Sequence, residues 1–246
     1  MRAQGGKREG LSQEEAKRFY DSIGKKQDIQ FYENRALSLL MSFSNFGSAR
    51  KVFEFGCGTG RLAVELLTRH LGENCSYLGV DISETMIGLC VERLSRWKAR
   101  AEARLVGGPI RFDVPDGSYD RFVAAYVLDL LSESDAGKVM AEAYRIMEPD
   151  GLLCVVSLAR GDTPFCRAVS AAWLKLFTYK PYWVGGCRPI EIGKSLDREL
   201  WGVVHDEVIS AFGGSSEVLV ARALKDGSRI ETENATTIVQ PEQPFS

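Results

Sequence analysis

An acid and three glycines lie together in one short stretch, Lys51–Leu67, which has the sequence KVFEFGCGTGRLAVELL. Glu54 is followed by glycines at alternate positions, Gly56, Gly58 and Gly60. Glycine adopts backbone angles closed to other residues and lets a ligand approach the main chain. A helix that begins at such a turn directs its unpaired N–H groups at the same spot. The pattern therefore predicts a strand, a tight turn and a helix that together bind a polar or anionic ligand.

A second acid, Asp81, ends the next apolar run, SYLGV, and precedes the potential helix cap Ser83. It follows the glycines by about twenty residues, the spacing at which a carboxylate binds ribose hydroxyls in nucleotide-binding units. The related dinucleotide fingerprint GxGxxG would need a glycine where this chain has Arg61. The combination favours a nucleoside ligand, whereas the glycines alone would be weak evidence.

Three motifs in order, FEFGCGTG, GVDISETM and PDGSYD, resemble the class I S-adenosylmethionine (SAM)-dependent methyltransferases. The resemblance extends from about Ala36 to Leu224 and is nearest to the ubiquinone/menaquinone-biosynthesis and small-molecule branch. It implies an α/β, doubly wound Rossmann-like fold whose seven-stranded, mostly parallel sheet ends in an antiparallel hairpin and carries helical caps. It also implies an enzyme that uses SAM to methylate a small molecule.

By this resemblance, the glycine turn and Glu54 hold the methionine end of the cofactor, Asp81 binds the ribose and Ile82 packs on the adenine. The cofactor-binding residues that we infer from it are Glu54, Gly56, Gly58, Gly60, Asp81, Ile82, Met86 and Gly108. One position departs from the family, which usually has Asp-Ala after the third strand. Gly108 offers no carboxylate there and Pro109 no N–H, so adenine recognition must be weaker or built differently.

Tyr126 and Asp129 are the candidate catalytic residues, because they lie at and just after the end of the fourth expected strand, where the family places the methyl group. Asp129 could orient or deprotonate a substrate, or merely cap the next turn. His70 and His205 are expected at the opposite edge of the sheet. A sulfonium is already a strong electrophile, so such a site mainly has to align the reactants without water, and no strong acid–base constellation is needed.

Composition limits the remaining possibilities. The chain has 246 residues, 45% of them hydrophobic, enough for one sizeable core, and its net charge of −2 argues against a nucleic-acid partner. The six cysteines form no CxxC pair, so we expect no metal site, and scattered single cysteines are typical of a reducing compartment. With no apolar N-terminal segment and no run long enough to span a bilayer, we expect a cytoplasmic protein.

Alternating patterns predict a parallel sheet with helices on both faces. The expected strands are 52–56, 76–81, 103–106, 119–127 and 151–158, and the expected helices between them are 59–71, 83–98 and 135–147. Strands 202–211 and 216–223 are joined by so short a loop that they must pair antiparallel. Helices over 11–22 and 29–42 form an N-terminal cap. We expect one domain over 11–225, between disordered ends at 1–10 and 226–246.

An insertion over 160–200 is rich in aromatic residues: Phe165, Trp173, Phe177, Tyr179, Tyr182 and Trp183. It leaves the ligand edge of the sheet, so it can roof a pocket for an apolar or aromatic acceptor, or its rings can simply pack a lid helix onto the domain. Two other functions remain open. The chain could be a non-catalytic SAM-binding regulatory or scaffold protein, as Gly108 and Pro109 suggest, or a protein or RNA methyltransferase.

Overall fold

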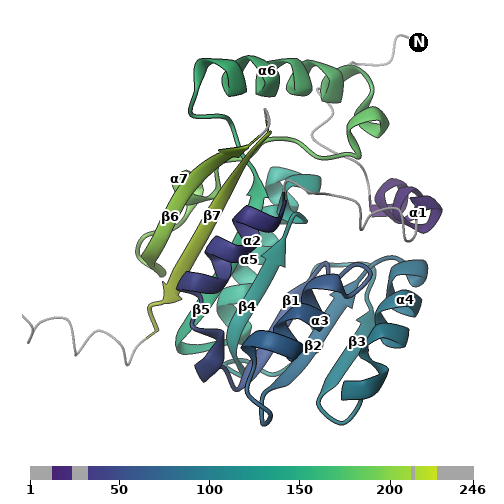
Figure 1. Ribbon diagram of the computed structural model, residues 1–246, viewed down its shortest axis with the longest axis vertical. Coiled ribbons are helices and arrows are strands. Elements are labelled where there is room, and N and C mark those ends of the chain that lie inside the picture. The colour runs from purple at the N-terminus through teal and green to yellow at the C-terminus, as the bar shows by residue number, and fades with distance from the viewer. Residues whose placement is uncertain (1–12, 24–32, 212–213, 226–246) are drawn as a thin grey trace, which may run out of the picture.

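The computed structural model describes residues 13–23, 33–211 and 214–225 (Figure 1). The ends expected to be disordered, 1–10 and 226–246, lie outside the described residues, as do the first residues of the second expected helix. The strands are β1 (Lys51–Phe55), β2 (Ser76–Asp81), β3 (Ala101–Leu105), β4 (Tyr119–Ala125), β5 (Met147–Leu158), β6 (Trp201–Ala211) and β7 (Gly214–Ala223). They form one sheet in the order β3-β2-β1-β4-β5-β7-β6.

The sheet is parallel from β3 to β5, and a C-terminal hairpin closes it. β7 pairs antiparallel with β6, as the short connection between the last two strands predicted, and also antiparallel with β5. Entry into β5 differs from the expectation. The strand begins at Met147, four residues earlier than predicted, and a register shift against β4 accommodates Asp150, whose φ is +61°. The Pro-Asp-Gly sequence thus forms a bulge inside the strand and not a turn before it.

Helices cover both faces of the sheet (Figure 1). They are α1 (Gln13–Ile23), α2 (Glu33–Phe43), α3 (Arg61–Glu65), α4 (Glu84–Leu94), α5 (Glu133–Ile146), α6 (Pro164–Tyr179) and α7 (Ile192–Ser195). The expected helix 59–71 is α3 followed by a single π-type turn, Leu66–His70. None of the described helices combines the length and the hydropathy needed to cross a bilayer.

Successive strand residues point to opposite faces, so the sheet separates two apolar cores. Val52 and Val123 pack with residues of α2, α3 and α4 in one core. Phe53 and Phe122 pack with α5 and α7 in the other, where their rings stack at a centroid distance of 5.5 Å. β1 and β4 therefore place apolar side chains on both faces of the sheet, as expected for the centre of a covered parallel sheet.

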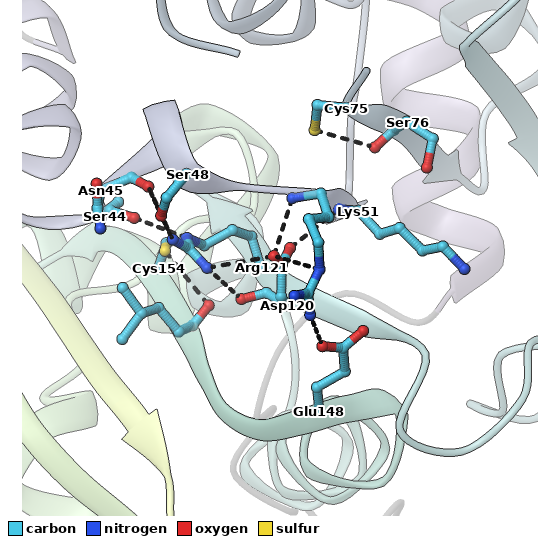
Figure 2. A network of polar contacts seen from close by, with 12 residues as sticks. Ser44, Asn45, Ser48, Lys51, Cys75, Ser76, Asp120, Arg121, Glu148 and Cys154 are labelled. Atoms are coloured by element: carbon cyan, nitrogen blue, oxygen red, sulfur yellow. Dashed lines mark hydrogen bonds and ion pairs between the residues drawn. The ribbon is translucent and has the colours of Figure 1, made fainter. Parts of the chain in front are cut away.

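A polar network fixes the edge of the sheet where β1 begins (Figure 2). The buried Arg121 guanidinium donates to the carbonyl oxygens of Ser44 and Asn45, each at 2.8 Å, and to Ser48 Oγ at 3.0 Å. Its neighbour Asp120 accepts the backbone N–H groups of Arg50 and Lys51 at 2.9 and 3.0 Å. The turn after α2 and the start of β1 are thus held at the edge opposite the glycine turn.

Candidate functional site

The glycine turn adopts the backbone conformation that its residue types predicted. Gly56, Gly58 and Gly60 have φ values of +73°, +51° and +78°, in the left-handed region. A Cβ on Gly56 would lie 2.5 Å from Val127 Cγ2, and one on Gly60 would lie 2.7 Å from Cys90 Sγ. These two glycines therefore let the turn pack closely against the end of β4 and against α4.

Asp81 ties this turn to the end of β2. Its Oδ2 accepts the N–H of Gly58 and its Oδ1 accepts the N–H of Ser83, each at 2.9 Å. Burial raises the pKa of Asp81, and these backbone donors oppose the rise. Because each carboxylate oxygen can accept more than one hydrogen bond, lone pairs remain for the hydroxyls of a ligand.

Glu54 is 2% exposed and receives a hydrogen bond of 2.6 Å from the hydroxyl of Tyr77. Burial raises its pKa to about 8, while the Tyr77 hydrogen bond opposes this. Nothing in the sequence around Glu54 identifies Tyr77 as its partner. Gly79, opposite Glu54 in the β1–β2 register, makes the contact possible, because a Cβ there would lie 2.6 Å from the Tyr77 oxygen.

The loop after β3 forms the cavity wall that contains Gly108 and Pro109, where the sequence departs from the family's usual Asp-Ala. Gly108, Pro109 and Ile110 line the cavity, and Gly108 has a φ of +79°. The loop is anchored from α5: Glu142 accepts the N–H of Phe112 and Arg145 donates to the Phe112 carbonyl, each at 2.8 Å. This wall is thus held in place by α5, and position 108 presents backbone and no carboxylate to the cavity.

Tyr126 and Asp129 follow β4, as expected. Tyr126 has a φ of +52°, and its hydroxyl shares a hydrogen bond of 2.9 Å with Ser216 Oγ on β7. Asp129 is fully buried; its Oδ2 accepts the N–H of Leu158 at 3.2 Å, and its Oδ1 has no hydrogen-bond partner among the described residues. Burial raises the pKa of Asp129 to about 7, opposed by that N–H and, more weakly, by the charge of Arg188.

One cavity of about 200 Å³ brings most of the predicted residues together. Those in its lining are Glu54, Gly56, Gly58, Asp81, Ile82, Gly108, Tyr126 and Asp129. Gly60 and Met86 do not line it. Gly60 packs on Cys90 instead, and Met86 is 0% exposed because α4 turns its side chain into the protein. The placement of Met86 at the cofactor is therefore corrected.

The cavity has a further wall, α1, which corresponds to the helix expected over 11–22 in the N-terminal cap, although none of its residues was among the predicted site residues. Ala16 and Tyr20 of α1 line the cavity. The helix is attached to the start of α4, where Asp21 accepts hydrogen bonds from Ser83 Oγ at 2.5 Å and from Thr85 N at 3.3 Å. The N-terminal cap was expected from the sequence, but its hydrogen bonds to the start of α4 were not.

The aromatic insertion contributes less to the cavity than expected. Among the described side chains of 160–200, which do not include that of Tyr182, Cys187 alone lines it, and Trp173 donates to the Cys187 carbonyl at 2.9 Å. Trp183 is 71% exposed and does not line the cavity. The insertion packs through the buried face of α6 and leaves several of its rings facing outward.

Neither histidine lines the cavity. His70 ends the turn after α3, and His205, near the start of β6, stacks on Phe43 with ring centroids 3.7 Å apart. The polarity of the strands and helices predicted both positions.

Known proteins match this chain in sequence over its central part. Residues 52–151 match the family model of the methyltransferase domain. The carboxy-S-adenosyl-L-methionine synthase of Shewanella pealeana is 31% identical over 103 residues, which cover 42% of this chain and 42% of that protein. The chain thus spans less than half the length of the curated relatives it matches.

Solved structures resemble the chain over most of its length. The cyclase SpnF superposes with a TM-score of 0.68 and 13% identity, covering 90% of this chain and 99% of that one. The N-methyltransferase NodS from Bradyrhizobium japonicum, in complex with S-adenosyl-L-homocysteine, gives 0.63 and 18%, covering 84% and 99%. At such identities the likeness concerns the fold. Residues 52–151 thus match a methyltransferase domain, and the chain has the fold of these solved structures.

Proposed function

We propose that this chain is an enzyme that binds SAM in the cavity and transfers its methyl group to a small, mainly apolar or aromatic molecule. The observation that carries the proposal is the convergence of Glu54, Gly58 and Asp81 on one cavity that Asp129 also lines. The first three fit the two ends of a nucleoside–amino acid conjugate. The fourth is a buried carboxyl whose Oδ1 has no hydrogen-bond partner among the described residues, so that oxygen can accept from a methyl acceptor.

The cofactor would be held from three sides. The Gly58 turn and the buried Glu54 suit the methionine end, because a buried carboxyl gains most from a cationic partner. Asp81 suits the ribose, since its backbone bonds already orient both of its oxygens. Ile82 and the Gly108–Ile110 wall would enclose the adenine, largely by apolar contact. The solved structure of NodS with S-adenosyl-L-homocysteine, on the same fold, supports this cofactor class.

When bound, SAM supplies an electrophilic methyl group on a sulfonium. During methyl transfer, the role of the protein is to hold the acceptor in line with the methyl group and to exclude water. Asp129 Oδ1 can accept a hydrogen bond from an acceptor O–H or N–H. Its pKa of about 7 lies near neutrality, where a carboxylate can also take the proton released on methylation. Tyr126, fixed by Ser216, would position the acceptor from the same wall.

The wall around Asp129 is mainly apolar, which supports the class of acceptor. Val127, Leu130, Leu131 and Leu158 line the cavity beside it. Apolar walls with a single polar anchor are typical of sites for small lipophilic molecules. The net charge of −2 supports such an acceptor over a nucleic acid.

A second candidate is the synthesis of a carboxylated SAM, favoured by the likeness of residues in the central part of the chain to the carboxy-S-adenosyl-L-methionine synthases. The deciding experiment combines calorimetry with SAM and S-adenosylhomocysteine and mass spectrometry of the products formed with a panel of lipophilic acceptors. Methyl transfer yields S-adenosylhomocysteine and a methylated acceptor. The rival reaction instead yields a carboxylated SAM, whose carboxyl group comes from a second, carboxyl-donating substrate added to the assay, and no methylated acceptor. Tight SAM binding without any product would favour a non-catalytic role and contradict the proposal.

A further inference from the structure

Helix α6 has one face packed on the protein and one face turned outward. The buried residues of the helix are Cys166, Ser170 and Phe177. They are four and seven residues apart, which is the spacing of one helix face. The helix lies beyond the ends of β4 and β5, on the side toward which the parallel strands run (Figure 1). The helix thus lies on the side of the sheet that carries the cavity.

The outward face carries a row of apolar and aromatic side chains. Phe165, Leu176 and Tyr179 are 68%, 36% and 82% exposed, and the exposed Ala168 and Ala172 complete the row at helical spacing. In the turn that follows, Pro181–Val184, Trp183 is 71% exposed. Large exposed rings gathered on one helix and the adjoining turn mark an interaction surface, whereas scattered ones would not.

Two lysines accompany the rings. Lys175 is exposed on α6 beside Leu176, and Lys180 follows the helix with its Nζ 4.2 Å from the centre of the Trp183 ring. From Thr163 to Ile190 the sequence contains no Asp or Glu, although the chain as a whole has a net charge of −2. The surface is therefore locally cationic as well as aromatic.

We propose that the outward face of α6 and the turn Pro181–Val184 bind the surface of an anionic membrane. A lipid interface accepts both kinds of side chain at once, because rings enter the headgroup region while lysine and arginine contact the phosphates. The length of α6 and its exposed aromatic row suit a helix that lies in the plane of the interface. The proposal concerns this surface alone, so it does not depend on methyl transfer.

The test is co-sedimentation of the full chain with vesicles of phosphatidylcholine, with and without phosphatidylglycerol. We expect binding to the anionic vesicles, weakening as salt rises, and little binding to the neutral ones. Lys175→Glu and Lys180→Glu should each lower partitioning at least about fivefold. Phe165→Ser with Tyr179→Ser should lower it independently of salt. All four side chains are exposed, so the fold should persist, as circular dichroism can verify.

The end of α4 offers a matched control. There Arg96 lies over the Trp97 ring at 4.5 Å, and Lys98 is exposed beside it. Arg96→Glu combined with Lys98→Glu changes the net charge as much as Lys175→Glu combined with Lys180→Glu. This control should leave vesicle binding unchanged. Trp183 fluorescence should shift to the blue on anionic vesicles, and Trp183→Phe should remove that shift. Equal losses in the control, no binding to anionic vesicles, or capture of an acidic protein in place of vesicles would overturn the proposal.

Discussion

Glu54 shows how one buried carboxyl can bind a ligand and also make the unliganded protein sensitive to pH. It lies near the end of β1, and among the described residues its one hydrogen-bond partner is the Tyr77 hydroxyl. Burial raises the pKa of Glu54 to about 8. The folded state therefore holds a proton that the unfolded chain releases at lower pH. A cationic ligand would draw that pKa down again.

We expect the unfolding free energy of the unliganded protein to fall between pH 5 and pH 8. The folded pKa of Glu54 is raised, so its stabilising protonated form is fully present below the ordinary carboxyl pKa of 4.5 and is lost as pH rises through about 8. Glu54→Gln, which can still accept from Tyr77, should reduce this fall. Urea unfolding at both pH values measures it. The exposed Glu92→Gln is the control and should leave the pH dependence of the unfolding free energy unchanged. If the unfolding free energy of Glu54→Gln falls with pH as steeply as that of the wild type, this assignment is contradicted.

Asp81→Asn should weaken SAM binding by about 1–3 kcal/mol, because it removes the charge from the hydrogen bonds to the ribose hydroxyls. Asparagine keeps one oxygen for the Gly58 or the Ser83 N–H, so the turn should persist better than with alanine. Calorimetry with SAM and with methionine measures the effect. Methionine has no ribose, so an equal loss for both ligands would place Asp81 away from the ribose.

Asp129→Asn should lower the rate of methyl transfer by roughly 10²–10⁴-fold while SAM affinity stays nearly unchanged, because the variant loses its proton acceptor on the acceptor side of the cavity. Single-turnover assays with labelled SAM measure the rate, and calorimetry measures the affinity. Tyr126→Phe, which keeps the ring but not the Ser216 hydrogen bond, provides the comparison. An unchanged rate in Asp129→Asn would remove Asp129 from the reaction.

At the scale of elements, α1 is a wall of the cavity that polar side chains attach to the start of α4. Its described polar links to α4 are Asp21 with Ser83 and Thr85, and an ion pair of Lys17 with Glu84 at 2.7 Å. The ion pair is largely exposed and contributes little. Asp21 therefore carries most of the polar anchoring of this helix at the cavity.

Asp21→Ala should weaken SAM binding several-fold and leave the melting temperature nearly unchanged, since α1 covers the cavity but lies outside the central core. Ser83 would keep its capping bond to the N–H of Met86 at 3.2 Å, so α4 itself should be intact. Calorimetry and a thermal melt measure the two effects. The exposed Glu14→Ala, on the same helix, is the control. A large loss of stability with no loss of affinity would mean that α1 serves the fold instead.

At the scale of the whole molecule, the two edges of the sheet have separate tasks. The cavity lies where β1, β2 and β4 end, whereas the Arg121 and Asp120 network lies where β1 begins (Figure 2). The guanidinium side chain of Arg121 is only 7% exposed, and its partners come from residues far away in the chain. This edge should therefore bear on stability and not on the ligand.

Arg121→Met should lower the unfolding free energy by about 3–5 kcal/mol, because the carbonyls of Ser44 and Asn45 and the Asp120 carboxylate lose a buried cation. Arg50→Met, at a guanidinium that is 71% exposed, should cost less than about 1 kcal/mol. Urea unfolding compares them. SAM affinity, measured well below the melting temperature, should be equal in both. A similar small cost for both arginines would show that the network does not hold this edge.

Local patterns determined the glycine turn, the alternation of strands and helices and the closing hairpin, because each depends on residue types and spacings that act over a few positions. Tertiary structure decided the rest. The bond between Tyr77 and Glu54 needs two neighbouring strands in register and the bare backbone of Gly79 between them. The burial that raises the pKa of Asp129, and the exposure of Trp183, depend on which distant elements cover each residue. Such contacts join segments far apart in the chain, so no pattern within either segment could predict them.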